Sequence, residues 1–206
     1  MVRSVLLVHG MGRTPLSMLR LARALRRAGC APHLFAYFSA WESVDAIVSR
    51  LSARLGVLGS GPYAAVGHSL GGLLLRAAVD RLDPGLRRPD RLIMLGTPNR
   101  SPRLARRFRR NWWYRLQNGE AGELLANEDR MLTFPIPPIP CTVIAGTRGI
   151  HTRWSSFGPD ENDGLVAVEE TRLAGADEWI LVPERHPFLM NHPAARAIVL
   201  QRCSAT

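Results

Sequence analysis

The chain has 206 residues, of which 46% are hydrophobic and 21% charged, a composition typical of one globular domain and not of a disordered or collagen-like chain. Its three cysteines lack the spacing of a zinc ribbon or a disulfide framework, which favours a reducing compartment. The net charge is +10, but seven of the 27 basic residues lie between Arg100 and Arg115, where there is no acidic residue. Because the basicity is local, it does not indicate a nucleic-acid-binding protein.

Six short apolar runs alternate with longer helical patterns along the chain. Each run is almost continuously apolar, as expected for parallel strands that helices cover on both faces. The predicted strands are Ser4–Val8, Pro32–Tyr37, Tyr63–Gly67, Arg91–Leu95, Cys141–Ala145 and Trp179–Val182. The first run is too short for the apolar core of a signal peptide, and no run approaches the ~18 residues that span a membrane. The sequence therefore predicts a cytoplasmic protein.

Four amphipathic segments separate or follow these strands. Apolar residues recur in them at helical spacing, and the first two segments end at glycines, Gly29 and Gly56. The predicted helices are Leu16–Ala28, Glu42–Leu55, Leu70–Leu82 and Pro193–Arg202. Strands that alternate with helices form a doubly wound, mainly parallel α/β sheet with right-handed crossovers. No repeat or linker divides the chain, so residues 1–206 are predicted to form a single domain.

The connection between the fourth and fifth strands is unusually long. Residues 99–140 far exceed a usual loop of ~4–6 residues, which predicts an insertion with its own helices, placed as a lid or cap. Apolar residues recur every four positions among its arginines, at Leu104, Phe108, Trp112 and Leu116. Arg103–Leu116 is therefore predicted to form one basic amphipathic helix. Such a helix can rest on an anionic membrane surface, close over an acyl pocket, or simply pack on the body of the protein.

A glycine-flanked serine follows the third predicted strand. The run Gly67-His68-Ser69-Leu70-Gly71 fits the pattern Gly-x-Ser-x-Gly, with a strand before it and a leucine-rich helix after it. Such a turn holds the serine in strained backbone geometry, and glycines two residues away leave room for it. The alternatives are a turn that only packs and a glycine-rich phosphate loop, but the chain has no lysine to complete a phosphate-loop motif. Ser69 is therefore the predicted nucleophile.

Several short motifs, and their order along the chain, resemble those of the α/β-hydrolases. The resemblance is to small bacterial lipase- and esterase-like members and to those similar to GPI-inositol deacylases. The motifs that carry the resemblance are, in chain order, His9-Gly10-Met11-Gly12, Gly67-His68-Ser69-Leu70-Gly71-Gly72, Gly96-Thr97-Pro98-Asn99, Asn162-Asp163-Gly164-Leu165-Val166 and a histidine after the last strand. The resemblance implies a minimal α/β-hydrolase fold whose first strand precedes His9. It also implies that Gly96–Asn99 shapes the floor of the pocket. Here Arg100-Ser101 replace a glycine that often follows the asparagine, which leaves the local backbone course open.

Attack of a serine on an acyl carbonyl creates an oxyanion, which needs two backbone N–H donors. The N–H of Leu70, at the start of the predicted helix, supplies one of them. The resemblance implies that the N–H of Met11 supplies the other, while Gly10 and Gly12 let this backbone approach the substrate. Taken alone, this segment would be an ordinary turn between a strand and a helix. His9 is predicted to be a buried structural residue.

The order Ser, Asp, His in this fold limits the choice of acid and base. Asp163 matches the acid motif of the family, and its neighbours Asp160 and Glu161 are the competing acids. Two histidines follow it: His186 comes directly after the last predicted strand, whereas His192 is placed to precede or cap the last helix. Asp163 and His186 therefore complete the predicted triad. A calcium site in the acidic loop is the weaker alternative, and no metal is predicted.

These residues predict a serine hydrolase of carboxylic esters, an esterase or lipase that works through an acyl-enzyme and needs no cofactor. An acyltransferase or a thioesterase would use the same triad. A non-catalytic module that binds a membrane surface or a partner would not need a complete triad. The predicted partners are a small or lipid-like acyl substrate and, through Arg103–Leu116, an anionic membrane surface. No nucleic acid is predicted, and the expected location is cytoplasmic with peripheral membrane contact.

Overall fold

One parallel sheet is the frame of the protein. The computed structural model describes residues 3–204, except for the side chains of residues 113–117. Its strands lie in the order β2-β1-β3-β4-β5-β6, and all neighbours are parallel. The strands are β1 (Ser4–Val8), β2 (Ala31–Phe35), β3 (Tyr63–His68), β4 (Arg91–Leu95), β5 (Cys141–Gly146) and β6 (Glu178–Val182). This confirms the prediction of a doubly wound α/β sheet of about six strands.

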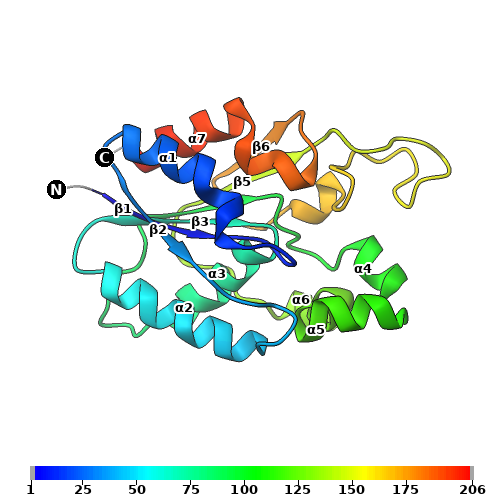
Figure 1. The fold of residues 1–206 in the computed structure, drawn as a ribbon, viewed down its shortest axis with the longest axis horizontal. Coiled ribbons are helices and arrows are strands. Elements are labelled where there is room, and N and C mark those ends of the chain that lie inside the picture. The colour runs from blue at the N-terminus through cyan, green and yellow to red at the C-terminus, as the bar shows by residue number, and fades with distance from the viewer. Residues whose placement is uncertain (1–2, 205–206) are drawn as a thin grey trace.

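Helices cover both faces of the sheet (Figure 1). One face carries α1 (Leu19–Arg27) and α7 (Pro193–Ser204), and the other carries α2 (Val44–Leu58) and α3 (Leu70–Asp80). Because side chains alternate along a strand, β1 sends Val5 and Leu7 into the core under α1 and α7. Leu6 and Val8 enter the core under α2 and α3. Both faces of β1 are buried, which explains why its sequence is apolar at nearly every position.

The element boundaries differ from the prediction by a few residues. β2 ends at Phe35, and Tyr37, the predicted last residue, donates its hydroxyl hydrogen bond to the carbonyl oxygen of His9 (2.8 Å). The helix predicted from Leu16 begins as a 3₁₀ turn, η1, because Pro15 lacks an N–H and fits a first turn. The 3₁₀ helices are η1 (Pro15–Met18), η2 (Val168–Thr171) and η3 (His186–Asn191). The last two were not expected, and they flank β6 in the chain.

Residues 99–140 contain three helices between β4 and β5. These are α4 (Arg103–Phe108), α5 (Trp112–Ala126) and α6 (Glu128–Leu132). Figure 1 shows them beyond the carboxyl ends of the strands, beside the long loop that follows β5. No helix in the described part of the chain is both long enough and apolar enough to cross a membrane.

The prediction of one continuous helix over Arg103–Leu116 is wrong. The chain turns after α4, where the N–H of Asn111 donates to the carbonyl oxygen of Phe108 (2.8 Å), and α5 starts in a new direction. In one continuous helix, Arg106 and Arg107 would lie about one turn from Arg109 and Arg110. Like charges at this spacing repel one another by about 0.2–0.5 kcal/mol per pair, which disfavours a longer helix. A second break lies inside α5 at Gly119, where φ is 53°. The side chain of Leu116 lies outside the described residues.

Candidate active site

The turn after β3 holds Ser69 in a backbone conformation that few side chains adopt. Ser69 has φ 53° and ψ −125°, and no other described non-glycine residue has a positive φ. The flanking glycines make this turn possible. A Cβ atom on Gly71 would lie 2.5 Å from the carbonyl oxygen of Val8, and one on Gly67 would overlap the backbone of Gly72. This segment therefore forms the predicted sharp turn and places Ser69 at the carboxyl end of the sheet.

Ser69 lies where the strand order reverses. The chain runs from β1 outward to β2 and then places β3 on the other side of β1, and ligands bind at such a switch point in open α/β sheets. The turn after β1 approaches closely, since a Cβ atom on Gly10 would be 3.0 Å from the Cβ atom of Ser69. The N–H groups of Met11 and Leu70 make no hydrogen bond to any described residue. Two unused donors thus flank the serine, one of them at the N-terminus of α3.

His186 and Asp163 form a buried pair. The Nδ1 atom of His186 lies 2.6 Å from the Oδ2 atom of Asp163, and their side chains are 5% and 1% exposed. His186 begins η3 after β6, and Asp163 lies in the loop after β5, so two adjacent strands bring them together. The second carboxylate oxygen, Oδ1, accepts hydrogen bonds from the N–H groups of Leu165 (3.0 Å) and Val166 (2.8 Å). These two bonds fix the carboxylate with Oδ2 aimed at the imidazole.

One cavity of about 270 Å³ opens on both Ser69 and His186. The rest of its lining is apolar: Met11, Pro98, Pro102, Leu104, Ala105, Phe108, Leu125, Leu165 and Val166. These residues come from the turn after β1, the segment after β4, the helices α4 and α5, and the loop that follows Asp163. A larger hollow of about 580 Å³ within the insertion is lined mainly by charged residues and lacks all the predicted site residues. The apolar cavity is therefore the candidate active site.

Proteins of known structure share this fold. The mature lipase BlEst2 of Bacillus licheniformis superimposes with a TM-score of 0.79 at 19% identity, covering 99% of this chain and 93% of that one. The Paleococcus ferrophilus monoacylglycerol lipase gives a TM-score of 0.62 at 16% identity, with 97% and 93% covered. The protein has an α/β-hydrolase fold of the lipase and esterase type. The type II thioesterase BorB from the borrelidin biosynthetic cluster also has a similar structure, with a TM-score of 0.62, 16% identity and 98% and 91% coverage. No protein-family model and no curated protein matches the sequence.

The alternative acids and the alternative base that the sequence offers do not line the apolar cavity. Asp160 forms an exposed ion pair with Arg103 (2.6 Å), and Glu161 is exposed. His192 accepts a hydrogen bond from the N–H of Ala194 (3.2 Å), which caps the start of α7. The described residues contain no group of three or more side chains that could hold a metal ion. Of the candidate acids and bases, only Asp163 and His186 pair with each other.

Two further histidines are buried around the nucleophile turn. The ring of His9 stacks on Tyr37 with centroids 4.3 Å apart, as expected of a structural residue. The Nε2 atom of His68 lies 2.9 Å from the carbonyl oxygen of His186, and because a carbonyl only accepts, Nε2 carries the proton. Burial, followed by the nearby imidazole of His186, lowers the pKa of His68 well below its usual value, so this ring is neutral. The sequence did not single out His68, because it occupies a variable position of the Gly-x-Ser-x-Gly pattern.

Buried polar side chains that the sequence did not reveal tie the insertion to the body. The guanidinium of Arg76 in α3 donates to Asn99 Oδ1 (2.8 Å) and to the carbonyl oxygens of Phe134 (2.9 Å) and Pro135 (3.0 Å). Burial lowers the pKa of Arg76 to about 10. These bonds join residues near both ends of the insertion to the helix that begins directly after Ser69.

Glu170 in η2 holds the start of the insertion. Its backbone carbonyl accepts hydrogen bonds from the N–H groups of Asn99 (2.8 Å) and Arg100 (3.1 Å), and its carboxylate accepts one from the N–H of Arg103 (2.8 Å). Burial raises the pKa of Glu170. The hydroxyl of Ser101 donates to the carbonyl oxygen of Leu125 (2.7 Å). The backbone at Arg100-Ser101 thus leaves β4 by a well-bonded path, although a glycine is absent there.

Proposed function

We propose that the protein is a serine hydrolase that cleaves carboxylic esters. The proposal depends on one observation: Ser69, with its strained backbone, and His186, which forms a buried pair with Asp163, line the same apolar cavity. Ser69 is the proposed nucleophile, His186 the general base and acid, and Asp163 the residue that orients the imidazole. Lipases and a thioesterase with the same fold support the hydrolase class.

The proposed reaction forms and then hydrolyses an acyl-enzyme. Nε2 of His186 takes the hydroxyl proton of Ser69 while Oγ attacks the acyl carbon, and the oxyanion binds the N–H groups of Met11 and Leu70. The C–O bond to the alcohol then breaks, and the alcohol leaves with the proton from His186. Water attacks the acyl-enzyme and gives a proton to His186, and the bond between the acyl carbon and Ser69 Oγ then breaks as Oγ takes this proton from His186, which releases the carboxylic acid. Asp163 keeps a proton on Nδ1, so that Nε2 is the nitrogen that accepts.

A fluorophosphonate probe is expected to label the protein at Ser69, because the probe phosphonylates a serine that a neighbouring base activates. Peptide mapping by mass spectrometry identifies the labelled residue. Ser69→Ala should remain unlabelled, whereas Ser52→Ala on α2 should label like the parent. Labelling at another serine, or none, would favour a non-catalytic module. Matched esters and thioesters of increasing acyl length, with and without an alcohol acceptor, then separate esterase, lipase, thioesterase and acyltransferase activity.

We also propose that residues 99–140 cover the cavity as a lid that meets an anionic membrane surface. Phe108 lines the cavity and is still 42% exposed, and Trp112, at the start of α5, is 60% exposed. Between them, Arg109 and Arg110 are exposed and make no ion pair or hydrogen bond with the described residues. Large apolar side chains beside unpaired arginines suit the boundary between lipid headgroups and acyl chains. The location would then be cytoplasmic with peripheral membrane contact.

Vesicles test the lid proposal. The parent protein should co-sediment with anionic vesicles more than with neutral ones, and high salt should weaken this binding because it screens the arginines. Arg109→Gln with Arg110→Gln should reduce binding to anionic vesicles by about tenfold. Arg26→Gln with Arg27→Gln removes the same charge from an exposed pair on α1 and should have little effect. Equal losses in both double variants would contradict a specific role of the insertion.

A further inference from the structure

A second hollow adjoins the candidate active site at the oxyanion turn. It has a volume of about 210 Å³ and is lined by Gly12, Arg13, Thr14, Phe38, Ser39, Ala40 and Trp41. Met11 lines the apolar cavity, and the next residue, Gly12, lines the second hollow. The two spaces therefore lie beside consecutive residues of the turn that carries the proposed oxyanion donor.

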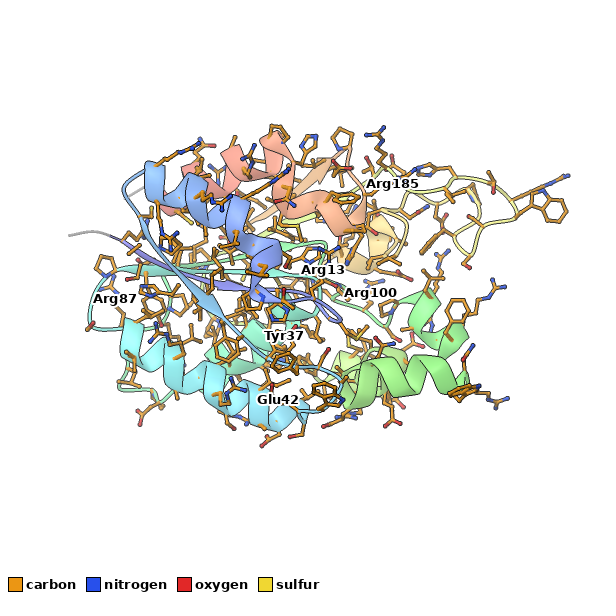
Figure 2. The ribbon with its side chains drawn as sticks, in the orientation of Figure 1. Arg13, Tyr37, Glu42, Arg87, Arg100 and Arg185 are labelled. Atoms are coloured by element: carbon orange, nitrogen blue, oxygen red, sulfur yellow. The ribbon has the colours of Figure 1, made fainter. Side chains whose placement is uncertain are left out.

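Arg13 is the charged group of this hollow. Its side chain is partly buried, yet the guanidinium makes no hydrogen bond or ion pair with any described residue. Arg13 and Tyr37 both lie at the carboxyl end of the sheet in Figure 2. Burial lowers the pKa of His9 and His68, the imidazole of His186 lowers that of His68 further, and the charge of Arg13 adds to the lowering of both pKa values. A cation with five donors thus faces the hollow without a protein acceptor.

The remaining lining can also hold a polar group. Ser39 and Thr14 bring hydroxyls, and Ser39 Oγ already accepts a weak hydrogen bond from the N–H of Gly12 (3.4 Å). Phe38 and Trp41 stack with ring centroids 5.9 Å apart and form an aromatic wall. No acidic side chain lines the space. The hollow therefore combines donors and positive charge, whereas the neighbouring cavity is apolar.

We propose that the second hollow binds an anionic group on the alcohol side of the ester, and that Arg13 is the residue that selects it. This inference rests on the proposed ester hydrolysis and names its substrate class. The apolar cavity suits the acyl chain, so the alcohol would pass the oxyanion turn and place a phosphate or carboxylate against Arg13. The planar guanidinium suits both groups, because it donates two parallel hydrogen bonds to either.

Two pairs of short-chain esters test whether the protein selects an anionic group on the alcohol side. The first pair is 1-butanoylglycerol 3-phosphate and 1-butanoylglycerol; the second is butanoyloxyacetate and butanoyloxyacetamide. The parent should prefer the anionic member of at least one pair by about tenfold or more in kcat/KM, chiefly through KM, since hydrogen bonds to charged groups are the stronger ones. The pair that shows the preference identifies phosphate or carboxylate as the anion.

Arg13→Gln should bring the ratio within each pair close to one, chiefly by raising KM for the anionic ester. Arg20→Gln, an exposed arginine on α1, is the matched control and should keep the parent preference. Equal preference in the parent and in Arg13→Gln, or no preference in the parent, would overturn the inference.

A binding measurement separates this inference from the proposed catalysis. Calorimetry of 1-butanoylglycerol 3-phosphate and butanoyloxyacetate with Ser69→Ala requires no turnover. At least one of these two ligands should bind to Ser69→Ala. The double variant Ser69→Ala, Arg13→Gln should bind that ligand about tenfold or more weakly. If the parent hydrolyses no ester but this difference is found, the proposed function fails and the anion site stands. If esters are hydrolysed but the binding of both ligands is unchanged, the anion site fails alone.

Discussion

Ser69→Ala and His186→Ala are each expected to lower kcat for ester hydrolysis by about 10³-fold or more, and the double variant should be little slower than either single one. The nucleophile cannot lose its proton without the base, and the base has no reaction to assist without the nucleophile. Both side chains line the same cavity, and the strained φ of 53° at Ser69 presents its hydroxyl there. Removing one of them therefore removes most of what both contribute.

Initial rates on 4-nitrophenyl butanoate measure this effect, and thermal unfolding checks that the variants are folded. His192→Ala is the control, because His192 lies at the start of α7, where it accepts the N–H of Ala194. We expect it to keep near-parent turnover even if the cap is lost. Inactive His192→Ala together with an active His186→Ala would show that the wrong histidine was assigned as the base.

The sequence predicts the sheet well because its four inner strands, β1, β3, β4 and β5, are buried on both faces. The run Tyr63–Gly67 in β3 is apolar without interruption, and a glycine-flanked serine soon after it is a local pattern that needs no distant contact to be recognised. The same holds for the order of the candidate residues along the chain. Fold class, strand positions and the sharp turn at Ser69 all follow from information within a few consecutive residues.

The insertion is harder to predict because its structure depends on distant contacts. A spacing of four residues indicated one helix, but this pattern takes no account of the like-charged arginines about one turn apart, which disfavour its continuation past Phe108. The bonds from Arg76 to Phe134 and Pro135 span almost sixty residues of sequence. The role of Arg13 is hidden for the same reason, since it depends on Phe38 and Ser39 from the segment after β2.

Asp163→Asn is expected to lower kcat by about 10³ to 10⁴-fold, because the substitution puts the proton of His186 on the wrong nitrogen. In the parent, Oδ1 accepts the N–H groups of Leu165 and Val166, and Oδ2 faces Nδ1 of His186. If the asparagine oxygen keeps the two backbone bonds, its NH₂ group points at Nδ1. Nδ1 must then accept, so the proton moves to Nε2, which can no longer take the proton of Ser69. The opposite orientation of the amide places NH₂ against two N–H donors, which costs both hydrogen bonds.

The measurement is kcat and KM on the same activated ester, together with the extent of fluorophosphonate labelling. KM should change little, because Asp163 does not line the cavity, and labelling should slow in parallel with kcat. Asp160→Asn and Glu161→Gln are matched controls three and two residues away, and both side chains are exposed. They should stay within about twofold of the parent, as surface substitutions usually have small effects. A large loss in either control, with near-normal turnover in Asp163→Asn, would move the orienting role from the buried carboxylate to the exposed one.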